Sequence, residues 1–287
     1  MKKTQLTIGK YVMLSFLALG IVFASCNKEE PVTEDLIKEP VTNPTPSDNI
    51  VHTRTQVPIV SKATGENCPP CGGWGWTDWI NLSDELAGKA FCWANYAGGY
   101  APSTGFNGKE LRAPASDATV MLGKYSGITG YPNFVTNMTS AGTSSANAKI
   151  AANASIANTD IKISAGFKHK IEGNTLTIEA EAKVWESVSG TYYMGAYLVE
   201  NNIVAYQNGS VAGGNNASHH LVFRGSLSSS TWGEEIINGT ASQDMILSKT
   251  YSIEIPAGYN KENFTYGIIV WKKLGGNYQY VNAATNQ

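Results

Sequence analysis

The 287-residue sequence has few cysteines, no cluster of basic side chains and no second long apolar run after residue 24. Its net charge is −2 and its pI is near 6.1, so a nucleic-acid-binding role has no electrostatic basis. No later apolar run is long enough to span a bilayer. The sequence also lacks a phosphate-binding loop, a dinucleotide fingerprint and a Gly-x-Ser-x-Gly motif, which leaves nucleotide-dependent enzymes and serine hydrolases without support.

Residues 1–25 are predicted to be a lipoprotein signal peptide. A basic start precedes residues 11–24, which are apolar, uncharged and too short to span a membrane comfortably. The segment Phe23-Ala-Ser-Cys26 resembles a bacterial lipobox, and the resemblance implies that the Cys26 thiol carries a diacylglycerol anchor. The alternative is an ordinary signal peptide followed by a chance cysteine.

The residues after Cys26 bear on localisation. Asn27 stands where an aspartate is associated with inner-membrane retention, which implies delivery to the outer membrane. Residues 27–30 resemble the export signal of some surface lipoproteins, although a short charge run is commonly just a solvated surface. Surface exposure is therefore favoured over a periplasm-facing position. Residues 26–49 are rich in Pro, Thr and acidic side chains and predict an extended tether.

The chemically most informative segment is Cys68-Pro-Pro-Cys71, which follows a β-type run at residues 56–63. Much later, Pro132 opens an apolar strand, as a proline beside such a dithiol would. Cys92 lies in a predicted buried strand and is interpreted as a small hydrophobic residue rather than a third redox partner.

The pattern from residue 50 to 153 predicts an α/β domain. A helix is expected to begin near Cys71, where its N-terminus would lower the pKa of Cys68. The glycines at 72, 73 and 75 predict a poor helical opening. The remaining predicted elements are a helix at 77–86, a strand at 90–94, a long loop at 96–114 carrying Tyr96, Tyr100 and Phe106, a helix at 116–125, a strand at 130–137 and a helix at 146–156. The loop is predicted to be either a functional lid or a packed insertion.

The dithiol segment and the later Gly130-Tyr-Pro132 segment together resemble thioredoxin-like proteins over about a hundred residues. The resemblance implies that Cys68 is the nucleophilic thiolate, Cys71 the resolving thiol and Pro132 a cis proline, and that the Tyr131 backbone pairs with a substrate segment. The chain departs from that family at two positions. Asn67 stands where an aromatic residue is usual, and Lys62 lies in the preceding strand, where an acidic residue is expected.

Residues 158–287 predict a second, all-β domain, an antiparallel sandwich of immunoglobulin or jelly-roll type. Apolar side chains alternate strictly from Leu176 to Val184. Hairpin turns are predicted at residues 172–174 and 275–277. Further strands are predicted at 161–170, 192–200, 203–207, 221–224, 250–255, 264–271 and 278–283.

Several segments of this second domain resemble the outer membrane protein twenty-eight family of Gram-negative lipoproteins, in which a thioredoxin-like domain precedes a β-sandwich. The segments are residues 197–200, 219–224 and 281–283, together with Gln207. The adjacent residues His219 and His220 point to opposite faces of a strand, so they are predicted to make structural polar contacts rather than a metal site. Arg224 is predicted to pair with Glu200.

These sequence features are consistent with two alternative functions. One is a thiol–disulfide oxidoreductase acting through Cys68 and Cys71. The other is a non-catalytic surface adhesin or receptor, in which a Cys68–Cys71 disulfide ties down the loop around Trp74, Trp76 and Trp79. No cofactor or metal is predicted. The predicted partners are the membrane, through lipid on Cys26, and a protein or peptide ligand, and the oligomeric state is left open.

Overall fold

The computed structural model describes residues 50–287 except 103 and 106–108. The predicted signal peptide, tether and Cys26 lipidation site lie outside the described residues, as does Phe106. Within the described part of the chain, no helix is both long and apolar enough to cross a membrane.

The dithiol lies in the connection between two parallel strands. Strand β1 (Ile59–Thr64) is buried throughout and runs parallel to β2 (Phe91–Tyr96). Between them, α1 (Pro69–Gly72) is a single turn that starts directly after Cys68, and α2 (Trp74–Glu85) follows without a long gap. Helix α2 therefore begins earlier than the glycines around Trp74 predict. Tertiary packing overrides the low helix propensity of this segment.

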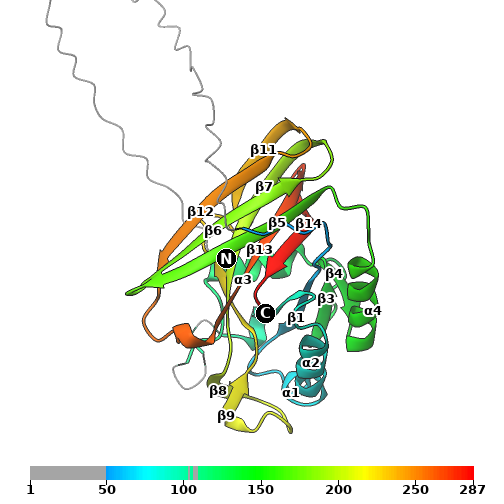
Figure 1. Cartoon of the computed structure of the whole chain (residues 1–287). Coiled ribbons are helices and arrows are strands. Elements are labelled where there is room, and N and C mark those ends of the chain that lie inside the picture. The colour runs from blue at the N-terminus through cyan, green and yellow to red at the C-terminus, as the bar shows by residue number, and fades with distance from the viewer. Residues whose placement is uncertain (1–49, 103, 106–108) are drawn as a thin grey trace, which may run out of the picture. The chain divides into compact units, whose positions relative to one another are not determined.

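Helices cover both faces of this part of the sheet (Figure 1). Helix α3 (Ala115–Lys124) packs on the β2 face that carries Asn95, whose side chain donates to the Ala118 carbonyl. Lys62 of β1 points to the opposite face, where its Nζ lies over the Trp76 ring of α2. Helix α4 (Ser145–Ile156) packs beside α2, on strands β3 (Asn133–Thr136) and β4 (Thr139–Gly142). Because side chains alternate along a strand, neighbouring residues reach different helices.

The remaining strands come from the C-terminal part of the chain. Their bounds are β5 (Ile163–Glu172), β6 (Thr175–Val184), β7 (Val188–Glu200), β8 (Ile203–Gln207), β9 (Gly214–His219), β10 (Val222–Ser226), β11 (Glu234–Ala241), β12 (Ile246–Glu254), β13 (Phe264–Leu274) and β14 (Asn277–Thr285). Two short 3₁₀ turns lie at Gly98–Tyr100 and Lys261–Asn263.

One nine-stranded mixed sheet runs through both halves of the chain. Its order is β14-β13-β7-β10-β2-β1-β3-β4, with β11 paired to the first part of β7. The junction is at β2, where Ala94 pairs in parallel with Val222 of β10. The sheet therefore passes the boundary predicted near residues 153–158 without interruption.

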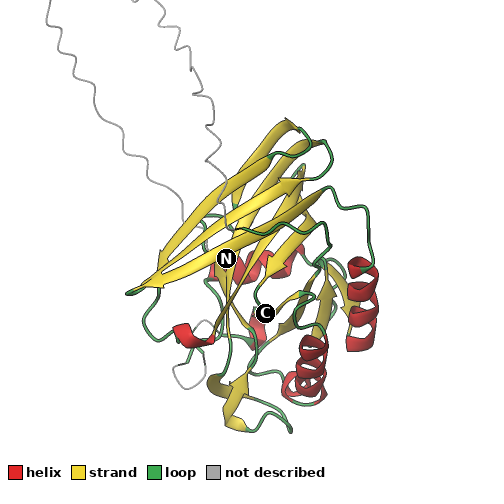
Figure 2. Cartoon of the chain, viewed as in Figure 1, coloured by secondary structure: helices red, strands yellow, loops and turns green. Residues whose placement is uncertain are grey.

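The second sheet has three strands, in the order β12-β6-β5, and packs over the β14-β13-β7 part of the large sheet (Figure 2). This antiparallel layer agrees with the predicted sandwich. The alternating residues of β6 all face its core, and both predicted hairpin turns connect paired strands. The sequence patterns did not reveal β4, β9 or β11.

Strands β7 and β13 are buried on both faces because each separates two cores. On β7, Met194 and Ala196 face the sandwich core, whereas Tyr197 and Val199 face the helix-covered core. Strand β13 has the same arrangement, with Ile268 and Val270 on one side and Ile269 and Trp271 on the other. This double burial explains why both strands read as nearly continuous apolar runs rather than alternating ones.

Candidate functional site

The two cysteines of the dithiol form a disulfide with a Cα–Cα distance of 5.2 Å. Neither is open to solvent: Cys68 is 2% exposed and Cys71 is fully buried. By contrast, Asn67, Pro69 and Pro70 are exposed, so the surface of this turn is made by the residues around the cysteines. A reductant must therefore displace part of the protein before it reaches either sulfur atom.

Pro132 lies against the start of α2. A Cβ built on Gly75 would be 2.5 Å from Cγ of Pro132 and 3.1 Å from the Pro70 carbonyl oxygen, so the absence of a side chain at Gly75 permits this approach. The Tyr131–Pro132 peptide bond is cis, as the resemblance to thioredoxin-like proteins implies. The structure thus brings the two segments singled out in the sequence together, through Gly75.

Exposed aromatic side chains lie near this turn. The Asn67 amide donates to the Tyr100 carbonyl at 3.0 Å, and the Tyr100 ring lies 6.1 Å from the Tyr131 ring. Trp74 is 45% exposed, whereas Trp79 is buried. The predicted 96–114 loop therefore contacts the disulfide segment at Tyr100.

A second segment, residues 207–212, starts at the last residue of β8, leads towards β9 and binds the disulfide turn; we call it the β8–β9 loop. The Gln207 side-chain amide donates to the carbonyls of Gly65 and Glu66 at 3.1 Å and of Cys68 at 3.4 Å. The amides of Val211 and Ala212 both donate to the Gly72 carbonyl, and the Asn208 amide donates to the Glu66 carbonyl. Backbone groups before and after the disulfide are thus held by the same loop.

A lysine lies behind the disulfide. Lys62 is 1% exposed, its Nζ donates to the Cys71 carbonyl at 3.3 Å, and it lies 5.8 Å from the centroid of the Trp76 ring. No carboxylate among the described residues forms an ion pair with it. Burial lowers the pKa of Lys62 to about 7. The negative charge of Asp78 acts in the opposite direction and raises this pKa.

Three further buried polar side chains lie around this turn. Glu66 is buried with both carboxyl oxygens unbonded in the described structure, and burial raises its pKa to about 7. His219 shares a 2.6 Å hydrogen bond between Nδ1 and the Tyr96 hydroxyl, while its Nε2 has no partner there. Burial, together with the Lys62 charge, lowers the pKa of His219 to about 3. Gln207 completes the set, with its Oε1 unbonded.

The other candidate residues make structural contacts. Cys92 is a free, buried thiol whose pKa burial raises to about 12. His220 points away from His219, and its Nε2 atom lies 3.7 Å from Oδ1 of Asp84. Arg224 pairs with Glu200 at 2.8 Å, as predicted. No group of three or more His, Cys, Asp or Glu residues in the described ranges is arranged to hold a metal ion.

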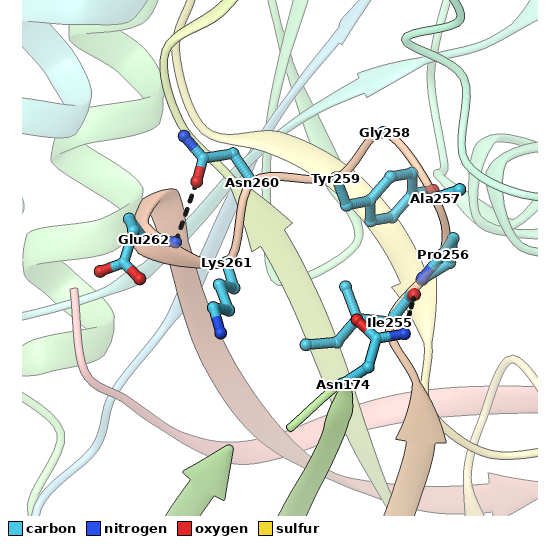
Figure 3. Close-up of a pocket in the computed structure, with 9 residues that line it drawn as sticks. All are labelled: Asn174, Ile255, Pro256, Ala257, Gly258, Tyr259, Asn260, Lys261 and Glu262. Atoms are coloured by element: carbon cyan, nitrogen blue, oxygen red, sulfur yellow. Dashed lines mark hydrogen bonds between the residues drawn. The ribbon is translucent and has the colours of Figure 1, made fainter. Parts of the chain in front are cut away.

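A separate hollow of about 510 Å³ lies at the β12–β13 turn (Figure 3). Its wall is formed by residues 255–262 and by Asn174, which donates to the Ile255 carbonyl at 2.9 Å. Arg224 stacks on Tyr259 of this wall at 4.1 Å, and Glu200 accepts from the Asn260 amide. The buried ion pair therefore anchors this turn. Its lining holds no cysteine, histidine or serine nucleophile.

Comparisons with known proteins place the fold. The structure is similar to HBP35 of Porphyromonas gingivalis, with a TM-score of 0.60 and 16% identity over 81% of this chain and 75% of that one. Weaker similarity exists to a protein of Agrobacterium tumefaciens (TM-score 0.48, 10% identity, 80% of this chain and 94% of that one). A domain of the outer membrane lipoprotein Omp28 from P. gingivalis matches more weakly still (TM-score 0.31, 15% identity, 44% of this chain and 87% of that one). No protein-family model and no curated protein matches the sequence. At these identities the similarity concerns the fold alone.

Sequence reasoning identified the cysteines and Pro132 but not the groups that surround them. Gln207 and His219 are more than 130 residues away from the dithiol in sequence, and no local pattern connects them to it. Lys62 was one available signal, since a lysine in the apolar strand before the dithiol is unusual. Glu66, two residues before Cys68, reads as a solvated loop charge, and that interpretation is wrong because the structure buries it.

Proposed function

We propose that this protein is an outer-membrane lipoprotein, anchored through lipid on Cys26, that carries out thiol–disulfide exchange through Cys68 and Cys71. The observation that carries the proposal is a set of three buried ionisable side chains around the disulfide turn, Lys62, Glu66 and His219, none of which forms an ion pair among the described residues. Burying ionisable groups without a counter-charge is unfavourable, and a disulfide that only staples a loop requires none of them. Perturbed ionisable groups beside a reactive pair are typical of functional sites.

In this proposal, Cys68 is the sulfur attacked by a protein thiolate and Cys71 the resolving thiol. The turn after β1, the approach of Pro132, the exposed Tyr100 ring and the half-buried Tyr131 ring support a thioredoxin-like use of this half of the molecule, with a peptide segment bound at Tyr131. Both cysteines are buried, so part of their surroundings must open before exchange occurs, and we assign this opening to the β8–β9 loop, which is hydrogen-bonded to backbone groups on both sides of the disulfide.

The test is the reduction potential of the Cys68–Cys71 pair, together with mixed-disulfide trapping in cells. A potential above about −300 mV is expected, in the range of exchange enzymes. The Cys71→Ser variant is expected to accumulate mixed disulfides with other proteins, and the matched Cys68→Ser variant is not. A potential well below that value and no trapped species in either variant would rule out exchange.

The second candidate is a surface-binding lipoprotein in which the disulfide is structural. Two observations favour it: the burial of both cysteines and the hydrogen bonds from the β8–β9 loop to the disulfide turn. In this case the exposed Trp74 and Tyr100 side chains would belong to a ligand-binding surface. An inert potential with retained binding to a host or envelope protein would support this candidate.

The location is tested separately. A Cys26→Ala variant is expected to leave the membrane fraction and to lose incorporation of labelled fatty acid. Protease added to intact cells is expected to cleave the wild-type protein if its folded part faces outward, as proposed. Protection until the outer membrane is permeabilised would place it in the periplasm instead.

A further inference from the structure

The hairpin that carries the β8–β9 loop continues the β7–β10 pair of the large sheet. Glu200 of β7 pairs with Val222 of β10. Three residues further along the hairpin, Ile203 of β8 pairs with His219 of β9, so the register is unbroken. Strands β8 and β9 nevertheless form a two-stranded sheet of their own (Figure 1). Residues 203–219, which we call the β8–β9 hairpin, are therefore one antiparallel unit that leaves the large sheet at a kink.

The kink lies in the two short gaps that separate β7 from β8 and β9 from β10. Asn202 has a φ of 55° and Leu221 a φ of 51°, so each strand passes through the left-handed region here. This backbone conformation is unfavourable for a leucine and persists only where the surroundings hold it. The Leu221 amide donates to Oδ1 of Asn201 at 2.7 Å, and the Leu221 carbonyl accepts from the Ala94 amide at 2.6 Å. The base of the hairpin is thus fixed to the sheet, and a movement of the hairpin would turn about this kink.

Hydrogen bonds hold the tip of the hairpin against the disulfide turn. The Asn208 amide donates to the Glu66 carbonyl at 2.7 Å. The amides of Val211 and Ala212 donate to the Gly72 carbonyl at 3.1 and 2.9 Å. All three acceptors belong to the turn and not to the hairpin. The three bonds would therefore break together if the hairpin moved away as one body.

The inner face of the hairpin carries mostly small or polar side chains. The buried residues of the hairpin are Ile203, Ala205, Gln207, Ala217 and His219. Two polar atoms of this face, Oε1 of Gln207 and Nε2 of His219, have no hydrogen-bond partner among the described residues. Water would reach both atoms if the hairpin lifted, which offsets part of the cost of the broken hydrogen bonds. Opening the hairpin is therefore less costly than separating an apolar core.

We propose that the β8–β9 hairpin is a hinged lid, which turns as one body about the kink at Asn202 and Leu221 and uncovers the disulfide turn. In the open position, a protein thiolate gains access to Cys68. This inference rests on the proposed exchange function and adds its regulation, because a hairpin from the C-terminal half of the chain decides when the dithiol can react. The moving unit is the whole of residues 203–219 and not the β8–β9 loop alone.

The first test is native-state hydrogen exchange of the oxidised wild-type protein, followed by NMR. The amides of Asn208, Val211 and Ala212 are expected to exchange with one common opening free energy, because a single movement frees them all. The amides that bond across the ladder between β8 and β9 are expected to exchange more slowly, since the hairpin stays paired as it turns. Ladder amides that exchange as fast as the three tip amides, or three different opening free energies at the tip, would overturn the inference.

The second test places a larger side chain on each face of the hairpin in turn. Ala217 is 1% exposed, so Ala217→Leu overfills the inner face and is expected to push the hairpin away from the disulfide turn. Reduction of the disulfide by dithiothreitol should become at least about fivefold faster. The matched control is Ser218→Leu, at the next residue on the exposed outer face, which should leave the rate unchanged. Position 217 lies outside the β8–β9 loop, so an unchanged rate in a folded Ala217→Leu protein would contradict a lid that moves as one body.

Neither test uses a protein substrate, so the lid and the exchange function can fail separately. Slow ladder exchange and a common tip opening, without trapped mixed disulfides, would reject exchange and leave the movement of the hairpin established. Trapped mixed disulfides together with rapid ladder exchange would support exchange and reject the hinged lid.

Discussion

At the scale of single residues, the molecule buries charge in two different ways. Arg224 and Glu200 neutralise each other directly, and their remaining atoms are also bonded: Arg224 to the Glu110 carbonyl, and Glu200 to the Asn260 amide. Lys62 has no such carboxylate partner among the described residues. The first arrangement is expected to matter for stability, and the second for pH dependence.

Removing one member of the Arg224–Glu200 pair should strongly destabilise the fold. Glu200→Gln or Arg224→Met leaves the other charge buried, at a cost of about 3–5 kcal/mol in the free energy of unfolding. The double variant should lose less than the sum of the two. Urea denaturation measures all three. The control is Glu234→Gln, which breaks an exposed pair with Lys249 and should change stability by no more than about 1 kcal/mol. Additive losses would contradict direct pairing.

Lys62 should make the oxidised protein more stable as pH rises from about 7 towards 10. Its folded pKa of about 7 lies below its ordinary value of 10.5, so between these values only the unfolded chain binds the proton. The slope can reach about 1.4 kcal/mol per pH unit. Urea denaturation at pH 7, 8 and 9 should show this rise in wild-type protein and a flatter profile in Lys62→Met. Parallel profiles would mean that Lys62 does not titrate in this range.

At the scale of elements, local sequence patterns predicted most strands and helices. They missed the elements that form because of tertiary contacts rather than local propensity. Strand β9 is rich in Gly and Asn, and β11 contains a glycine, so neither resembles a strand by composition. Helix α2 begins at Trp74 beside Gly75, a weak helical opening that is retained because Pro132 occupies the space of a side chain at Gly75.

The β8–β9 loop should control access to the disulfide. In Gly72→Ala, the new Cβ would overlap the backbone carbonyl oxygen of Asn208, which cannot move without displacing the loop. This overlap should outweigh the gain of about 1 kcal/mol in helix propensity. Reduction of the disulfide by dithiothreitol should become at least about tenfold faster, which corresponds to about 1.4 kcal/mol less opening free energy.

The matched control for the loop experiment is Gly99→Ala. Nothing lies within 4 Å of a Cβ at this position, which is on the other segment that contacts the disulfide turn. Its reduction rate should equal that of the wild-type protein. An unchanged rate in Gly72→Ala, with the fold intact by circular dichroism, would show that the loop does not limit access.

At the scale of the whole molecule, the two predicted domains share one sheet, and the described residues from 50 to 287 belong to one compact unit. Trp93 of β2 packs 5.7 Å from Phe223 of β10, and the Ala94 amide donates to the Leu221 carbonyl. The first half of the chain therefore obtains part of its core and one sheet neighbour from the second half.

A fragment of residues 50–157 should consequently fail to fold alone, because β2 would become an edge strand and Trp93 would lose its contact with Phe223. The measurement is NMR dispersion of the fragment beside that of residues 50–287, which should also unfold in one calorimetric transition. A well-dispersed spectrum from the short fragment, or two transitions in the long one, would contradict this expectation.

The sequence alone determined the local features of this protein: the dithiol after a strand, the proline that approaches it, the alternating strands of the sandwich and the lipobox-like start. These follow from short-range periodicity and from a few residues with special chemistry. The tertiary structure alone decided that one sheet joins the two halves, that a loop more than 130 residues away holds the disulfide turn, and that Lys62, Glu66 and His219 surround it. Burial and long-range pairing depend on which distant segments meet, and no local pattern encodes that.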